Sequence, residues 1–63
     1  MRLKELREEN KYTQQYVADI LNIRQNTYSQ YENKKREIPI RALIVLAKLY
    51  DVSVDYILEL TDY

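Results

Sequence analysis

The sequence predicts an all-α fold of five short helices. Apolar residues recur at spacings of three and four, which places them on one helix face, and no segment alternates apolar and polar residues as a half-buried strand would. Residues that favour helix ends, chiefly Thr, Ser, Asn, Asp and the single Pro, separate these segments. We expect one domain, residues 1–63, with an efficient core, because so short a chain buries only about 60% of its unfolded surface.

The first two predicted helices span residues 2–9 and 14–21. Leu3 and Leu6 lie one turn apart in the first helix and are expected to share a buried face. Thr13 precedes the second helix, where its hydroxyl can accept a hydrogen bond from a backbone N–H of the first turn. The residues expected to face inward from the second helix are Val17, Ala18 and Leu21.

A turn of three or four residues leads to the third helix, predicted over residues 25–32. Asn22 is expected to end the second helix, because asparagine tolerates the left-handed conformation better than most non-glycine residues. Tyr28 and Tyr31 are the inward residues of the third helix, whose other residues are polar. This helix therefore has one apolar stripe and a wide polar surface.

The last two helices are predicted over residues 40–50 and 54–60. Pro39 suits the opening of the fourth helix, because its missing N–H would have no partner there. The spacing indicates a fourth-helix stripe of Ile40, Leu43, Ile44 and Ala47, widened by Leu46 and Tyr50. Ser53 is placed to cap the fifth helix, whose inward residues are expected to be Val54, Ile57 and Leu58.

The composition excludes most enzyme chemistry. The chain has no Cys and no His, so it lacks the usual metal and redox ligands and has no imidazole to act as an acid or base at neutral pH. An enzyme would have to work with carboxylates and two serines alone. We therefore expect a binding module with no catalytic residues, no metal and no cofactor.

The sequence favours a cytoplasmic protein without a membrane partner. The longest apolar run, residues 42–47, is far shorter than the roughly 20 residues that span a bilayer. The first ten residues lack the apolar core of a signal peptide. The absence of cysteine also fits a reducing compartment.

The net charge of zero is the sum of a basic part and an acidic part of the chain. Residues 1–48 contain all ten basic residues and six acidic ones, whereas residues 49–63 contain four acidic residues and no basic one. From Arg24 to Arg41 the chain has five basic residues against two acidic ones. An anionic partner is expected to meet this middle segment, with the acidic fifth helix turned away.

Two helices joined by a short turn are typical of a helix-turn-helix. The run TQQYVADILNIRQNTYSQYENKKREIPIRALIVLAKLYDVSVDYIL resembles the Cro/C1-type (XRE-like) helix-turn-helix family of phage repressors and bacterial regulators, and the likeness extends from Leu3 to Leu58. The motifs that carry it are TQQYVA, LNIR, YENKKR and VSVD. The resemblance implies a lambda-repressor-like fold and a sequence-specific DNA-binding transcriptional regulator, a repressor, encoded by a bacterium or phage.

The chain departs from the family pattern at four positions. Asn22, Lys34 and Asp51 stand where the family commonly carries glycine. Asparagine and aspartate adopt a left-handed turn at modest cost, whereas Lys34 would be strained there. Arg24 replaces the customary Ser or Thr cap of the third helix, so the first residue of that helix is predicted only to within about one position.

The resemblance implies that the third helix enters the major groove of double-stranded DNA. The expected base contacts are Gln25, Asn26, Thr27 and Gln30. The chemistry fits independently, because Gln and Asn amides pair bidentately with adenine and a Thr methyl can contact thymine. The alternative is that these polar side chains only keep an exposed helix soluble, although Lys and Glu are more usual on such a face.

Phosphate contacts are expected on both sides of this helix. Gln14 lies at the start of the second helix, where backbone N–H groups and the helix dipole favour an anion. The other expected phosphate contacts are Arg24, Ser29, Lys34, Lys35, Arg36 and Arg41. Such contacts position a protein on DNA without reading sequence, and the alternative for the charged loop is a solvated surface.

Arg7 and Glu32 are expected to form a partly buried ion pair, which members of the resembled family often have at these positions. The pair would be structural rather than catalytic. It would join the first helix to the end of the third.

The resemblance also implies a homodimer on a palindromic operator, because one such helix reads only a few base pairs. The expected dimer interface consists of Tyr56, Leu60 and Tyr63. Tyrosine suits an interface because its ring buries area while its hydroxyl stays hydrated. An alternative function is the antitoxin of a toxin–antitoxin pair, which uses the same fold to bind a toxin and regulate its own operon.

Overall fold

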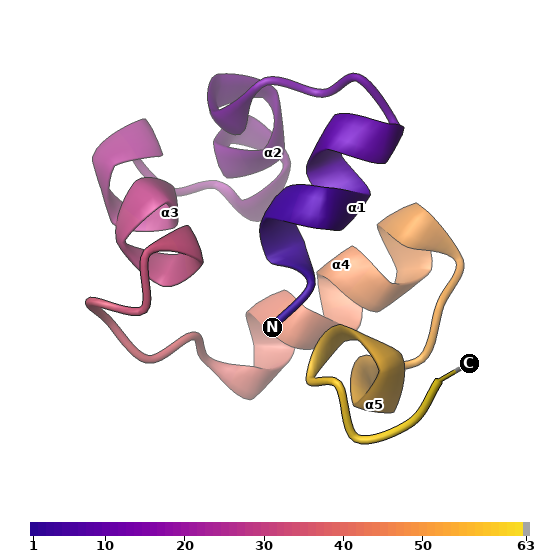
Figure 1. Cartoon of the computed structure of the whole chain (residues 1–63). Coiled ribbons are helices and arrows are strands. Elements are labelled where there is room, and N and C mark those ends of the chain that lie inside the picture. Colours follow the sequence, from indigo (N-terminus) through magenta and orange to yellow (C-terminus); the bar gives the residue numbers. More distant parts are fainter. Residues whose placement is uncertain (63) are drawn as a thin grey trace.

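The computed structural model describes residues 1–62, and these residues form five helices and no strand. The helices are α1 (Leu3–Glu9), α2 (Gln14–Leu21), α3 (Gln25–Glu32), α4 (Ile40–Tyr50) and α5 (Val54–Ile57). Figure 1 shows α1 lying between the pair α2 and α3 on one side and the pair α4 and α5 on the other. The all-α prediction is confirmed. None of the five helices is long and apolar enough to span a bilayer.

The core is formed by one face of each helix and by the loop before α4. Leu3 and Leu6 of α1 are buried, as are Tyr28 and Tyr31 of α3, in agreement with the predicted stripes. The other buried apolar residues are Val17, Ala18, Ile38, Ala42, Leu43, Leu46, Tyr50 and Ile57. The tyrosine rings of α3 therefore fix which side of that helix faces outward.

The predicted stripe of α4 is confirmed for Leu43, Leu46 and Tyr50 and is wrong for Ile40 and Ile44. Ile40 and Ile44 are 73% and 45% exposed, whereas the buried residues of this helix are Ala42, Leu43, Leu46 and Tyr50. The helix is apolar on most of its circumference, so two stripes with helical spacing fit its sequence equally well. Packing against the other helices selects one of them and leaves the two isoleucines on the surface.

The predicted end of α5 is also wrong, because the helix stops at Ile57 and not at Leu60. Its start is as expected, since the hydroxyl of Ser53 accepts a hydrogen bond of 3.0 Å from the first turn. Glu59 then adopts a left-handed conformation, with φ of 63°, and the N–H of Leu60 bonds back to the carbonyl of Asp55 at 2.9 Å. A left-handed residue followed by such a bond closes the helix end.

Positive φ angles occur at five non-glycine residues of the described chain, namely Lys11, Asn22, Lys34, Asp51 and Glu59. Asn22 and Asp51 end α2 and α4 in the left-handed conformation, as the sequence predicts. Lys34 has φ of 60° in the loop after α3. Its Cβ therefore meets the steric cost that glycine avoids.

Replacing Lys34 by glycine should stabilise the fold. A left-handed residue with a Cβ costs about 1–2 kcal/mol, and the greater freedom of glycine in the unfolded chain offsets part of the gain, so we expect about 1 kcal/mol from urea unfolding. Lys35→Gly is the matched control, because Lys35 has no positive φ and should lose stability. If the free energy of unfolding fell equally in the two variants, strain at Lys34 would be contradicted.

Candidate nucleic-acid interface

The turn from Asn22 to Arg24 sets α3 against α2. Thr13 caps α2 by accepting a 3.0 Å hydrogen bond from the N–H of Tyr16. The left-handed Asn22 ends that helix, and the N–H of Ile23 bonds to the carbonyl of Ala18 at 3.0 Å. The backbone of Arg24 is extended and α3 begins at the next residue without a side-chain cap. The start of α3 therefore lies at its predicted position despite the unusual residue before it.

The polar side of α3 is accessible because its tyrosines occupy the opposite side. Gln25 and Asn26 are exposed at the start of the helix, and Thr27 and Gln30 are half-buried. Tyr28 is fully buried. The four residues expected to contact bases thus include two that are freely accessible and two that are partly covered by neighbouring side chains.

The structure brings Gln14 of α2 and Gln25 of α3 together. Nε2 of Gln25 donates to Oε1 of Gln14 at 3.4 Å, and Nε2 of Gln14 donates to Oε1 of Glu32 at 3.1 Å. The sequence alone assigned Gln14 to a phosphate contact and Gln25 to a base contact. They form a single hydrogen-bonded chain that ends on a carboxylate.

Glu32 is held by Arg7 from α1. Nε of Arg7 donates to Oε2 of Glu32 at 2.7 Å and Nη2 donates to Oε1 at 3.3 Å, while Nη1 donates to the carbonyl of Tyr12 at 3.0 Å. The side chains of Arg7 and Glu32 are only 13% and 3% exposed. Burial acts to raise the pKa of Glu32, but hydrogen bonds, first of all from Arg7, and the positive charge of Arg7 outweigh it and hold that pKa below its usual value.

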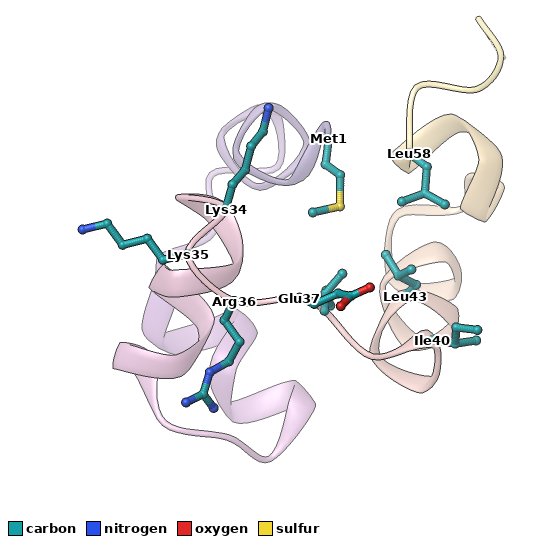
Figure 2. Close-up of a pocket in the computed structure, with 9 residues that line it drawn as sticks. Met1, Lys34, Lys35, Arg36, Glu37, Ile40, Leu43 and Leu58 are labelled. Carbon is teal, nitrogen blue, oxygen red and sulfur yellow. The ribbon is translucent and has the colours of Figure 1, made fainter.

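The basic residues expected to contact phosphate are exposed but do not form one cluster. Figure 2 shows the side chains of Lys34, Lys35 and Arg36 diverging from the loop after α3. All three side chains line a groove of about 560 Å³ together with Met1 and Leu58. Exposed residues also include Arg24 and Arg41, whereas Ser29 is half-buried and accepts a 3.3 Å hydrogen bond from Asn33.

The three residues expected at a dimer interface differ in their surroundings. Tyr56 is half-buried, with the guanidinium of Arg2 4.6 Å from its ring centroid. Leu60 is 72% exposed. Tyr63 lies outside the described residues. The exposed Ile40 and Ile44 were missed, because the predicted stripe of α4 placed them in the core.

No group of three or more acidic, His or Cys side chains suited to a metal ion occurs in residues 1–62.

Comparison with known proteins relates nearly the whole chain to one family. The helix-turn-helix family model matches residues 3–57. The uncharacterized HTH-type transcriptional regulator YobD of Bacillus subtilis (strain 168) is 46% identical over 61 residues, which cover 97% of this chain and 54% of YobD. The HTH-type transcriptional regulators AnsR and ImmR of the same organism are 42% and 46% identical over 57 residues, 90% of this chain.

These matches cover 49% of AnsR and 45% of ImmR, so the chain spans about half the length of the curated relatives it matches. All three names describe regulators and none describes an enzyme, as the composition predicted. No solved structure matches the chain.

Removing the Arg7 guanidinium should destabilise the fold strongly. In Arg7→Ala the buried Glu32 carboxylate loses its countercharge, and breaking such a pair costs about 3–5 kcal/mol. Urea unfolding would measure the loss. Lys4→Ala, at an exposed position of the same helix, is the control and should change stability by less than about 0.5 kcal/mol. A similar small change in both variants would contradict a structural role for the pair.

The lowered pKa of Glu32 gives the stability of the fold a specific acid dependence. A carboxylate whose pKa is depressed by folding stabilises the native state above its unfolded value, here 4.5, and this contribution is lost as the pH falls through the folded pKa. The free energy of unfolding of the wild type should therefore fall more between pH 7 and pH 3 than that of Glu32→Gln, whose amide does not titrate. Parallel curves for the two proteins would contradict the assignment, because the remaining carboxylates are common to both.

Proposed function

We propose that this chain, which belongs to the Cro/C1-type helix-turn-helix family, is a sequence-specific domain for double-stranded DNA that represses transcription as a homodimer. The observation that carries the proposal is the exposed start of α3, where Gln25 and Asn26 extend from a helix whose other side is locked by buried tyrosines. A helix held this way offers its amides to the major groove without rearrangement. The names of the relatives, all transcriptional regulators, support the same function.

In this proposal α3 contacts the base edges. The Gln25 and Asn26 amides can each pair with the N6 and N7 edge of adenine. Thr27 offers a methyl group for thymine, and Gln30 lies about one turn further along the helix. Thr27 and Gln30 are half-buried, so their side chains have less freedom to adapt to a base than the two exposed amides.

Phosphate contacts in this proposal come from exposed cations and polar groups around α3. The exposed cations proposed for this role are Arg24, Lys34, Lys35, Arg36 and Arg41, with Gln14 and Ser29 as neutral partners. Lys34, Lys35 and Arg36 also line the groove beside Met1. These contacts would fix the register of α3 on the duplex and carry no sequence information.

In this proposal a dimer recognises a longer DNA site than one α3 can read alone. Two copies related by a two-fold axis would bind half-sites about 34 Å apart, and the operator would be palindromic. The apolar surface available for such an interface includes Leu60 of the expected set, together with Ile40 and Ile44 of α4. Repression would follow when the bound dimer occludes RNA polymerase.

Selection of bound duplexes from a random pool tests this function. The wild type should return a palindromic motif, and Gln25→Ala should lose about 1–3 kcal/mol on it and relax the preference at one position of each half-site. Gln15→Ala is the matched control, since the Gln15 side chain is exposed and bonds to Asp19 at 2.8 Å on α2. Absence of any motif with the wild type would overturn the proposed function, and equal loss on every sequence would reassign Gln25 to the DNA backbone.

A further inference from the structure

We propose that the hollow between the turn after α2 and the start of α4 binds a small apolar monocarboxylate, and that this ligand releases the domain from DNA. The release from DNA rests on the proposed function, whereas the binding site itself does not. The inference is carried by the lining of the hollow, which is apolar except for Arg41, Asn22 and the hydroxyl of Tyr31.

The hollow has a volume of about 360 Å³ and is lined by residues of α2, α3 and α4. Asn22 adopts the left-handed conformation, with φ of 59°, so the chain reverses and both Ile20 and Ile23 line the same hollow. Val45 lines it from α4 and is 39% exposed. Tyr31 of α3 is only 6% exposed, which gives the hollow a fixed aromatic surface next to the core.

The size of the hollow favours a small molecule over a protein. Its volume lies at the lower end of the range of small-molecule sites, about 300–1,000 Å³. Nine residues line it, whereas a stable protein interface takes about 20–30 residues on each side. The lining therefore suits a ligand with a compact apolar body.

Arg41 gives the hollow a preference for one negative charge. It is the only charged residue among those that line the hollow, and no carboxylate of residues 1–62 forms an ion pair with it. A guanidinium can donate two parallel hydrogen bonds to a carboxylate. A phosphate dianion would bring a second charge that an apolar lining does not compensate. The matching ligand is a monocarboxylate on an aromatic or branched aliphatic body.

The same arginine couples this site to DNA. Arg41 is one of the phosphate contacts in the proposed function, so a bound carboxylate and a DNA phosphate compete for one guanidinium. The hollow also adjoins the turn that sets α3 against α2. Such coupling is reciprocal, because the ligand weakens duplex binding by the same factor as the duplex weakens ligand binding. The carboxylate therefore acts as an inducer.

NMR titration of the isotope-labelled full chain tests the site without DNA. The probes are benzoate, phenylacetate, indoleacetate and isovalerate, each with its primary amide as the uncharged control. At least one carboxylate should shift the backbone N–H signals of Ile23, Ala42 and Val45 to saturation and bind about tenfold or more tightly than its amide. Failure of all four carboxylates to do so would overturn the inference.

Two pairs of variants on α4 locate the binding. Arg41→Gln should weaken the carboxylate about tenfold or more and leave its amide unchanged, whereas Lys48→Gln removes an exposed cation that does not line the hollow and should change neither. Val45→Asn should weaken both probes about threefold through lost apolar contact, with Ile44→Asn, outside the hollow, as its control. These four positions are exposed, so we expect every variant to fold, which thermal melting checks.

Equal weakening in Arg41→Gln and Lys48→Gln would assign the effect to general charge and overturn the site. Equal weakening in Val45→Asn and Ile44→Asn would place the probe elsewhere on α4 and overturn it as well.

A competition experiment with the duplex selected from the random pool tests the release from DNA. The best carboxylate should weaken duplex binding in proportion to its occupancy of the free protein, whereas its amide and sodium chloride of equal ionic strength should not. Unchanged duplex affinity at saturating carboxylate would overturn the inducer role. A wild type that selects no duplex would instead remove the proposed function, while the titration without DNA would still decide the site.

Discussion

The salt bridge between Arg7 and Glu32 is the contact on which the rest of this small structure depends. A carboxylate so nearly removed from water is stable only beside a countercharge, so α1 and the end of α3 must meet at this point. Once α3 is held there, and its tyrosines are packed in the core, the helix cannot turn about its axis. The outward direction of Gln25 and Asn26 is therefore a consequence of the buried tyrosines together with the ion pair at the other end of the helix.

The ends of most helices were predictable because their signals act over a few residues. Thr13 and Ser53 cap the helices that follow them through their own hydroxyls, and Asn22 and Asp51 supply left-handed turns at little cost. Glu59 gives no such signal, since glutamate has no special tolerance for positive φ, and the end of α5 was missed for that reason. The position of the ion pair came from the family resemblance and not from any spacing in the chain.

The features that could not be predicted depend on how the helices pack. The apolar circumference of α4 allows two stripes, and only contact with the other helices distinguishes them, so Ile40 and Ile44 were assigned to the core. The bond between Gln14 and Glu32 joins residues 18 positions apart on two helices, with no motif that couples their side chains. The site residues were therefore identifiable one by one, whereas their linkage was visible only in three dimensions.

The separation of charge along the chain also acquires a spatial meaning in the fold. In Figure 1 α3 and α5 lie on opposite sides of α1, so the exposed Asp55 of α5 lies apart from α3, whereas the Glu59 carboxylate is paired with the N-terminal ammonium at 2.8 Å. Separated charges orient a molecule near a polyanion, whereas residence on arbitrary duplex depends on net phosphate neutralisation. For a domain that binds DNA, the search for its site would then proceed by frequent release and correctly oriented re-encounter, with only short one-dimensional sliding.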